Sequence, residues 1–253
     1  MKELPDKYID LTVTSPPYGN LREYKGYVFD FELIANELFR ITKDGGVVVW
    51  IVGDAVINGS ETGTSFKQAL YFKDLGFYLH DTMIYKKAGM SNPDTNRYYQ
   101  IFEYMFVLSK NKPKTFNPIK DKKNIWGGQF SRSNNRQKDG SLVYKSRKKT
   151  KEYGIRFNIW EYNTGYGHST KDDMAFKHPA IFPEKLAEDH VKSWSNEGDI
   201  VLDPMCGSGT TMKMAILLNR KFIGFDISQE YCELANKRLR PLREQGVLFG
   251  YYE

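Results

Sequence analysis

The chain has 253 residues, of which 40% are hydrophobic, and a net charge of +6. This length suits one large domain, or one domain with an insertion, and the apolar content is enough for a buried core. The longest apolar run, residues 47–52, falls far short of the roughly 20 residues that span a bilayer, so no transmembrane helix is expected. The first residues lack the apolar stretch of a secretory signal, and Cys206 and Cys232 are expected to be reduced thiols. A cytoplasmic location is therefore predicted.

The positive charge is concentrated in one segment of the chain. Residues 110–151 hold 14 Lys and Arg against two acidic residues, a local charge of +12, so the remainder carries −6. Such an asymmetry points to a polyanionic partner for this segment.

The first part of the chain predicts alternating strands and helices. Its first β-rich run ends at Pro16 and Pro17, because proline removes the amide donors that a ladder needs. A helix follows a candidate N-cap at Thr64 or Ser65 and ends at Gly76. The expected elements are strands at 9–15, 47–52, 77–85 and 102–108, and helices at 29–40 and 64–76.

Residues 111–175 interrupt this alternation, since they are rich in Lys, Arg, Asn, Ser and Gly with isolated aromatic residues. They are predicted to be an insertion between 1–110 and 176–253. Beyond it, the expected elements are helices at 183–195, 210–219 and 228–240 and strands at 199–203 and 221–226. Alternating strands and helices indicate an α/β fold with a doubly wound, mostly parallel sheet.

Residues 203–211, DPMCGSGTT, join a predicted buried strand to a helix through two glycines. Open α/β sheets bind ligands at such corners. Met212 stands where a dinucleotide fingerprint requires Gly or Ala, and no Gly-Lys pair follows as in a phosphate-binding loop, so neither NAD nor ATP fits. Asp226 ends the next strand, where a carboxylate can accept hydrogen bonds from ribose hydroxyls. The structural alternative is an ordinary corner with an aspartate that caps a helix.

The second chemical motif is TSPPY, residues 14–18. An amino group conjugated with a heteroaromatic ring is a poor nucleophile. The Ser15 hydroxyl and the carbonyl of Pro16 can accept both of its N–H protons and so expose the nitrogen lone pair, and the two prolines hold that carbonyl rigidly outward. Tyr18 offers a ring on which an extruded base can stack. The structural alternative is a strand that ends in a polyproline turn.

TSPPY (14–18), HPAIFPEKL (178–186) and VLDPMCGSGTT (201–211) together resemble the amino-group DNA methyltransferases, in the motif order of their β class. The resemblance covers about 1–110 and 176–253. It implies a Rossmann-like catalytic domain, S-adenosylmethionine as methyl donor and S-adenosylhomocysteine as product. It also implies double-stranded DNA with a flipped target base as the partner, and a place in a restriction-modification system. A homodimer and a cognate restriction endonuclease are further expected partners.

By position, the resemblance assigns residues to two roles. The expected catalytic residues are Ser15, Pro16, Pro17, Tyr18 and Asp54, the last as an acceptor for the target amine. The expected cofactor-binding residues are Asp203, Pro204, Cys206, Gly207, Ser208, Gly209, Thr210, Thr211, Asp226, Ile227, His178 and Pro179. For His178 the alternative is a capping or surface histidine, and for Asp54 a loop aspartate after a glycine. No metal site is expected.

One feature departs from the family pattern. The amino-group DNA methyltransferases often have a strand and a Gly-Asp pair before the helix that precedes TSPPY. In this chain TSPPY starts at residue 14, which leaves no room for them. That strand is expected instead at 246–253, where Tyr251, Tyr252 or Glu253 could approach the adenine ring of the cofactor; a truncated N-terminus is the alternative.

The insertion combines basic and aromatic residues, and is expected to be the DNA target-recognition region. Lys and Arg supply affinity for phosphates, whereas Arg and aromatic residues can meet base edges or fill a vacated stack. The expected DNA-binding residues are Trp126, Arg132, Arg136, Lys145, Arg147, Lys148 and Lys149. The alternative is a solvated loop with a run of charges.

The resemblance favours cytosine N4 over adenine N6, because adenine enzymes of this type usually have Asp or Asn where Ser15 stands. Methylation at cytosine carbon-5 requires a cysteine nucleophile, typically after proline, and the sequence has no Pro-Cys pair. The sequence leaves open a DNA-binding protein without catalysis, and a methyltransferase that acts on RNA or protein.

Overall fold

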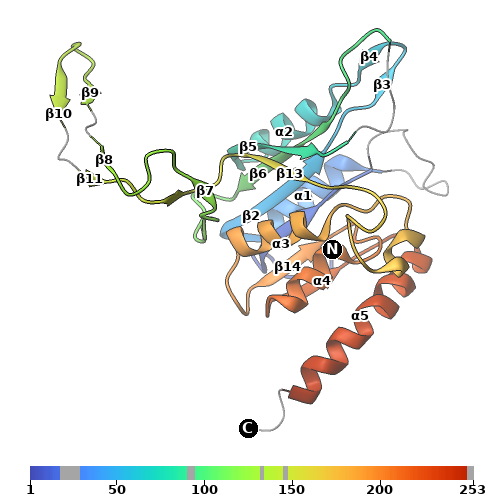
Figure 1. Cartoon of the computed structure of the whole chain (residues 1–253). Helices are drawn as coiled ribbons and strands as arrows, with labels where there is room; N and C mark the ends of the chain where they lie inside the picture. The colour runs from blue at the N-terminus through green and yellow to red at the C-terminus, as the bar shows by residue number, and fades with distance from the viewer. Residues whose placement is uncertain (18–28, 90–94, 132–133, 145–147, 250–253) are drawn as a thin grey trace. The chain divides into compact units, whose positions relative to one another are not determined.

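The computed structural model describes residues 1–17, 29–89, 95–131, 134–144 and 148–249 (Figure 1). The chain forms two compact units. Unit 1 comprises Met1–Asn117 and Asn158–Glu253, and unit 2 comprises Pro118–Phe157. Within the described residues, no helix has both the length and the apolar character that crossing a membrane requires.

Unit 1 is built on a seven-stranded sheet with the order β13-β5-β6-β2-β1-β14-β15. Its strands are β1 (Ile9–Thr14), β2 (Thr42–Val52), β5 (Tyr78–Lys87), β6 (Phe102–Ser109), β13 (Ile159–Tyr162), β14 (Ile200–Asp203) and β15 (Lys221–Gly224). Strand β1 pairs in parallel with β2 and β14, and β14 pairs in parallel with β15. Among these strands, β6 alone is antiparallel to both neighbours. The mostly parallel sheet expected from the sequence is confirmed.

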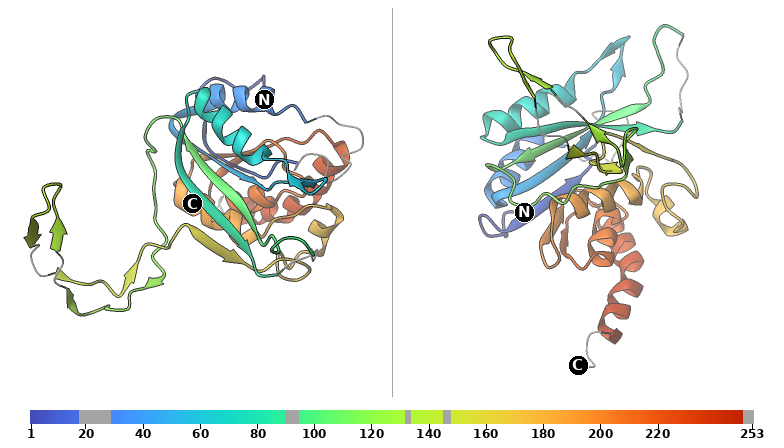
Figure 2. Two further views of the ribbon diagram at one scale, coloured as in Figure 1. Left: turned by 90° about the horizontal axis from the view of Figure 1, so that it is seen from above. Right: turned by 60° about the vertical axis from the view of Figure 1, so that its left-hand side comes forward.

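Helices cover both faces of the sheet (Figure 2). On one face lie α1 (Phe31–Ile41) and α2 (Thr64–Asp74), and on the other α3 (Glu184–Trp194) and α4 (Thr210–Leu217). The 3-10 helix η2 (Asp173–Lys177), the long helix α5 (Gln229–Phe249) and the short hairpin of β3 (Val56–Ile57) and β4 (Ser60–Glu61) complete unit 1. The predicted alternation of strands and helices is therefore present.

The main apolar core lies between the sheet and the α1–α2 layer. Leu38 of α1, Trp50 of β2 and Phe72 of α2 are fully buried there. The rings of Trp50 and Phe72 meet edge to face at 5.2 Å, and the Trp50 indole donates to Gln68 Oε1 at 2.8 Å. Because the buried polar group is paired, this core can hold a rigid platform under the loops at the sheet edge.

Strand β13 comes from the segment that the sequence assigned to the insertion. Trp160 and Tyr162 are buried while Ile159 and Glu161 are exposed, the alternation of a half-buried strand. This strand pairs in parallel with β5. The separate unit, 118–157, is shorter than the expected insertion of 111–175, because residues 111–117 and 158–175 belong to unit 1.

The expected C-terminal strand at 246–253 is wrong for its first half. Residues 246–249 continue α5, which runs for 21 residues from Gln229. Pro241 lies inside this helix, but residues 242–245, LREQ, all favour helices, so the helix extends past the predicted stop at 240. Residues 250–253, with Tyr251, Tyr252 and Glu253, lie outside the described residues.

Unit 2 is a set of nested antiparallel ladders. From base to tip these are β7 (Lys122–Lys123) with β12 (Tyr153–Gly154), β8 (Phe130–Ser131) with β11 (Lys148–Lys149), and β9 (Asn134–Arg136) with β10 (Leu142–Tyr144). Gly140, at φ +85°, lies in the tip turn, which the bond from Gln137 N to Ser141 O closes. The unit carries 12 basic and three acidic residues.

Candidate functional site

The parallel strands β1, β2 and β14 bring three predicted site residues to one edge of the sheet. Thr14 pairs in register with Trp50, and Thr12 with Leu202. The carboxyl ends of these strands therefore lie side by side. Asp203 is the last residue of β14, and Ser15 and Asp54 follow the ends of β1 and β2. In open α/β sheets, ligands bind outside the carboxyl ends of the strands, so this edge is the candidate site.

A buried hydrogen bond joins the ends of β1 and β14. The Thr14 hydroxyl donates to Asp203 Oδ1 at 2.7 Å, and the Met205 amide donates to the same oxygen at 3.2 Å. Asp203 is only 2% exposed. Burial raises the pKa of Asp203 to about 6, although the hydrogen bonds from Thr14 and Met205 favour the carboxylate. This contact places Ser15, the residue after Thr14, beside the glycine-rich loop; Ser15 itself is half-buried.

The loop after Asp203 needs its glycines. Gly207 and Gly209 have φ angles of +47° and +80°, a region that favours glycine because it has no Cβ. The loop is held by the bond from Gly209 N to Cys206 O at 2.7 Å and by that from Cys206 N to Phe225 O at 2.8 Å. Its backbone is therefore both close-packed and free of side chains at the two glycine positions.

The start of helix α4 is tied to β1. The Thr211 hydroxyl donates to the Val13 carbonyl at 3.1 Å, and both residues are buried. Thr210 and Ser208 are buried as well. The predicted cofactor-binding run from Asp203 to Thr211 thus forms one continuous corner against the end of β1.

Asp226 follows β15 and holds the glycine-rich loop from the side. Its Oδ2 accepts from Gly207 N at 2.9 Å and its Oδ1 from Ser228 N at 2.9 Å. A carboxylate oxygen can accept a second hydrogen bond, so Asp226 keeps acceptor capacity for a ligand. The next residue, Ile227, is 67% exposed, an apolar side chain at the mouth of the same loop.

His178 lies against the glycine-rich loop although it is far from it in sequence. A Cβ built on Gly207 would stand 2.8 Å from His178 Nε2. The imidazole packs edge to face on Tyr231 at 4.3 Å, and its Nδ1 lies 2.9 Å from the Ala180 carbonyl oxygen. The structure thus brings His178 against the glycine-rich loop, and the next residue, Pro179, is exposed.

Asp54 is already engaged by the protein. Its Oδ1 accepts from the Thr62 hydroxyl and from Ser65 N, both at 3.0 Å, and its Oδ2 accepts from the Ser65 hydroxyl. Helix α2 begins after Gly63, which provides no side-chain cap, so Asp54 supplies the missing acceptor. The predicted cap at Thr64 or Ser65 is therefore wrong, and these contacts make Asp54 the cap of α2.

The two cysteines form no disulfide. Cys206 is buried, and burial raises the pKa of its thiol, so it stays protonated. A protonated buried thiol is a poor nucleophile, which agrees with the absence of a Pro-Cys pair. In the described part of the chain, no group of His, Cys, Asp and Glu side chains has the arrangement of a metal site.

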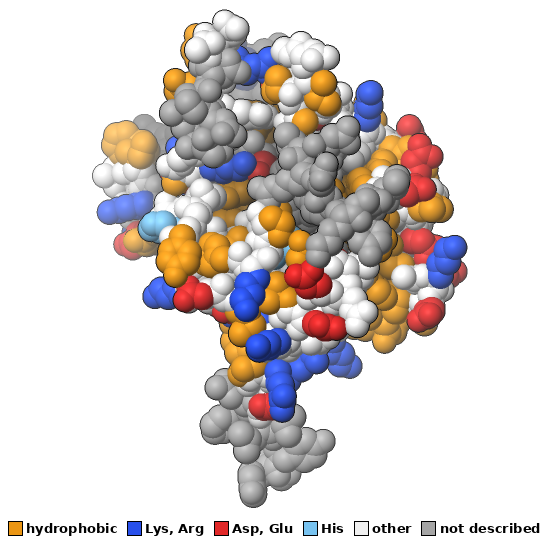
Figure 3. Space-filling model, turned by 90° about the vertical axis from the view of Figure 1, so that its right-hand side faces the viewer, with side chains coloured by type: hydrophobic (Ala, Val, Ile, Leu, Met, Phe, Trp, Pro, Cys, Tyr) orange, Lys and Arg blue, Asp and Glu red, His pale blue; other side chains and the backbone are white. Residues whose placement is uncertain are grey.

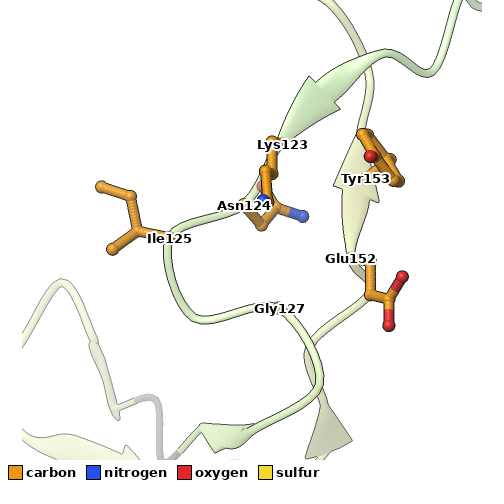
Figure 4. A pocket seen from close by; sticks show the side chains of 6 residues that line it. All are labelled: Lys123, Asn124, Ile125, Gly127, Glu152 and Tyr153. Atoms are coloured by element: carbon orange, nitrogen blue, oxygen red, sulfur yellow. The ribbon is translucent and has the colours of Figure 1, made fainter.

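The predicted recognition residues lie in unit 2. Trp126 is 65% exposed, and Arg136, Lys148 and Lys149 are exposed. The neighbouring Ile125 is 90% exposed and points away from the turn that carries it (Figure 4). The remaining predicted residues, Arg132, Lys145 and Arg147, lie outside the described residues, as does the predicted catalytic residue Tyr18.

The turn that carries Ile125 and Trp126 is tightly made. Asn124 Nδ2 donates to Lys151 O at 2.8 Å, and Gly127 N donates to Asn124 O at 3.0 Å. A Cβ on Gly127 would meet Glu152 Cα at 2.9 Å, so a larger residue has no room there. The hairpin thereby presents two large apolar side chains to solvent.

Sequence reasoning missed Arg238. Its side chain is 1% exposed and makes hydrogen bonds with the glycine-rich loop and with two carboxylates. A signal was present, because Ala235 and Leu239 define the buried face of this helix and Arg238 lies on the same face.

The chain is similar to known proteins over most of its length. A family model described as DNA methylase, of the N6/N4 methyltransferase type, matches residues 9–237. An orphan methyltransferase of Bacillus amyloliquefaciens, M.BamHII, is 62% identical over 95% of this chain and 92% of its own. The type II methyltransferase M.HpaI of Haemophilus parainfluenzae is 30% identical over 94% of this chain and 70% of its own.

Solved structures share the fold. The PvuII DNA methyltransferase, titled cytosine-N4-specific, superposes with a TM-score of 0.65 at 20% identity, covering 98% of this chain and 89% of its own. A putative DNA modification methylase of Thermus thermophilus, solved with S-adenosyl-L-methionine, gives a TM-score of 0.62 at 22% identity, over 95% and 89% of the two chains.

Because the Asp203 carboxyl is buried, we expect its ionisation to lower the free energy of unfolding as the pH rises. Because its folded pKa is about 6 and its ordinary value 3.8, it stabilises the protein most when protonated, and this contribution is lost as the pH rises through about 6. Asp203→Asn removes the charge and keeps an acceptor for Thr14. Relative to wild type, the free energy of unfolding of this variant should rise by on the order of 3 kcal/mol between pH 4 and pH 7.5.

Urea denaturation of the ligand-free protein at several pH values measures this difference. Thr14→Val is the matched control, since it removes a donor and leaves the carboxyl titratable. A gap between Asp203→Asn and wild type that stays constant with pH would contradict the assignment.

Proposed function

Since the chain belongs to the N6/N4 DNA methylase family, we propose that it transfers a methyl group from S-adenosylmethionine to the exocyclic N4 amino group of cytosine in duplex DNA. The observation that carries the proposal is the contact between Thr14 and Asp203, at 2.7 Å. It joins the Ser-Pro-Pro segment, suited to an amino group, to the loop suited to the methyl donor.

Members of this family use S-adenosylmethionine, and the residues at the sheet edge fit it. Gly207 and Gly209 give the loop the left-handed backbone that its tight turn needs, and Asp226 has acceptor capacity for ribose hydroxyls. In the proposal, Ile227 supplies an apolar surface beside the adenine, and the His178–Pro179 segment closes the loop from the opposite side. When bound, the cofactor supplies an electrophilic methyl group.

The chain's own groups prepare the nucleophile. The Ser15 hydroxyl and the Pro16 carbonyl each accept one proton of the target amine, so that the nitrogen lone pair turns toward the methyl group. Tyr18 stacks on the extruded base, and Pro17 keeps the Pro16 carbonyl pointing outward. The transfer is direct, so no covalent enzyme intermediate is needed, in agreement with the protonated Cys206.

Ser15 supports cytosine as the target. The resemblance associates Asp or Asn at this position with adenine, so a serine there favours cytosine. N6-adenine methylation by a serine variant of the motif is the second candidate, because the family includes both targets.

Unit 2 is the proposed DNA-recognition element. Exposed Arg136, Lys148 and Lys149 supply phosphate affinity, and Trp126 is available for base contacts. The names of the relatives, type II and orphan methyltransferases, support a role in or alongside a restriction-modification system. A cognate endonuclease and a homodimer stay predictions.

Asp226→Ala should weaken the binding of S-adenosylmethionine by roughly 10- to 100-fold, the effect of losing charge-assisted hydrogen bonds. DNA affinity should not change. Titration calorimetry with the cofactor measures the first effect, and fluorescence anisotropy of labelled duplex DNA the second. Asp226→Asn keeps an acceptor oxygen and should lose less; Glu233→Ala, on the exposed face of α5, is the matched control. Unchanged cofactor affinity in Asp226→Ala would remove Asp226 from the site.

Replacing Arg147, Lys148 and Lys149 with Gln should lower DNA affinity and reduce the slope of log K against log salt concentration, by about 0.9 for each lost phosphate contact. Cofactor affinity should stay at the wild-type value, because these residues belong to unit 2. DNA-binding titrations at four or more salt concentrations give the slope.

The matched control for this triple variant replaces three exposed lysines of unit 1, Lys2, Lys67 and Lys73, with Gln. It removes the same charge. If both triple variants reduced the slope equally, the effect would come from net charge, and the run 147–149 would be a solvated loop.

Ser15→Ala removes one of the two proposed acceptors. Loss of one preorganised electrostatic partner costs on the order of 10²- to 10³-fold in rate, so this variant should fold and bind cofactor normally but transfer methyl groups that much more slowly. Cys232→Ser serves as the control and should keep the wild-type rate. Single-turnover kinetics with labelled cofactor measure the chemical step.

Nucleoside analysis of the methylated DNA by mass spectrometry identifies the target atom. The methyl group should appear in N4-methylcytosine. N6-methyladenine would overturn the choice of base and keep the mechanism, whereas 5-methylcytosine would overturn both.

A further inference from the structure

Arg238 differs from the other basic residues of helix α5. Lys237, Arg240 and Arg243 are exposed, and Figure 3 shows basic side chains along the surface of this helix. The Arg238 side chain is 1% exposed. A guanidinium group is rarely buried unless its N–H donors are paired, so the hydrogen-bond partners of Arg238 indicate its role.

One side of the guanidinium holds the glycine-rich loop. Arg238 Nη1 donates to the Ser208 carbonyl oxygen at 2.9 Å and to Thr210 Oγ1 at 3.2 Å. Ser208 stands between the two glycines, Gly207 and Gly209, whose conformations give the loop its shape. Arg238 therefore holds the Ser208 carbonyl in place, between the two glycines that shape the loop.

The other side holds the segment that carries His178. Arg238 Nε donates to Asp172 Oδ2 at 2.7 Å, and Asp172 Oδ1 accepts from Met174 N at 3.1 Å, so the same carboxylate caps η2. The C-cap of η2 is His178. Arg238 Nη2 donates to Glu184 Oε1 at 2.5 Å, in the first turn of α3. The two carboxylates thus bracket the segment 173–183.

The cluster is electrically balanced. Lys213 Nζ donates to Glu184 Oε1 at 2.7 Å, and the Thr170 hydroxyl donates to the same oxygen at 2.6 Å. Two cations face two anions. Although burial raises it, the pKa of Asp172 stays below its ordinary value, because the Arg238 guanidinium donates to the carboxylate. Breaking such a pair costs more than its formation gains, since a buried charge is left uncompensated.

We infer that Arg238 is a positioning residue that sets the separation of the glycine-rich loop from the His178–Pro179 segment, and so sets the affinity for the methyl donor. The inference rests on the proposed cofactor site. A planar guanidinium donates in three fixed directions at once, toward Ser208, Asp172 and Glu184, whereas an ammonium group is a single point that cannot span them. The role of Arg238 therefore depends on the planar geometry of its guanidinium group as well as on its charge.

The test compares Arg238→Lys with Arg240→Lys, which makes the same change at an exposed position of the same helix. Arg238→Lys should raise the dissociation constant and the KM for S-adenosylmethionine by about 10-fold or more, while kcat at saturating cofactor and the affinity for DNA stay within about twofold of wild type. Arg240→Lys should match wild type in all four. Measurements are made at a temperature where each variant is fully folded.

Hydrogen exchange separates positioning from general stability. In Arg238→Lys, the amides of 206–211 should exchange faster while those of β2 and β6 keep their protection. Asp172→Asn provides a second variant if Arg238→Lys fails to fold, since it keeps an acceptor oxygen and weakens only the hold on η2; its cofactor KM should rise as well.

Two outcomes would overturn the inference. One is a lower melting temperature in Arg238→Lys with unchanged cofactor affinity, and the other is equal loss of kcat and DNA affinity. If wild-type protein itself failed to bind S-adenosylmethionine in calorimetry, the proposed function would fail first, so the two failures are distinguishable.

Discussion

The hydrogen bond between the Thr14 hydroxyl and the buried Asp203 carboxylate is the contact on which the site depends. It joins residues 189 positions apart, at the ends of two adjacent parallel strands. A carboxylate that is 2% exposed is tolerated only where donors meet it, and here Thr14 and the Met205 amide do so. Because Ser15 follows Thr14 and the glycine-rich loop follows Asp203, this one contact sets the distance between the segment suited to an amino group and the loop suited to a methyl donor.

Around this contact the loops are held by polar bonds, while the platform beneath them is held by apolar packing. Asp226 accepts from Gly207 N, and Arg238 donates to Ser208 O, so two peptides of the loop are fixed by side chains from two different segments. The core on the α1–α2 face, with Trp50 and Phe72, makes the sheet edge rigid. Hydrogen bonds have a preferred direction and apolar contacts do not. Apolar packing therefore makes the sheet rigid, and hydrogen bonds fix the orientation of the loops at its edge.

The two units differ in apolar core, in charge and in the extent of strand pairing. Unit 1 has the buried core and a slight excess of acidic residues, whereas unit 2 has 12 basic residues, three acidic residues and only short ladders. Large apolar side chains such as Ile125 and Trp126 stay exposed there, which is costly in water and favourable against a stacked or unstacked base. This difference in composition supports the proposal that unit 2 binds DNA phosphates and that methyl transfer takes place at the sheet edge of unit 1.

The sequence by itself determined what local pattern encodes. Strands and helices with a clear period lie where predicted. Strand β1 ends at Thr14, before Pro16 and Pro17, because proline has no N–H to donate to a ladder. Only the tertiary structure decided matters of pairing. The four-residue strand β13 forms by pairing with β5, which lies more than 70 residues away in the chain. Asp54 caps helix α2 because Gly63, at the N-cap position, has no side chain. The role of Arg238 depends on Asp172 and Glu184, which lie 66 and 54 positions from it. Hydrogen-bond partners that far apart leave no periodic trace in the chain, since the fold, and not the spacing, brings them within 3 Å.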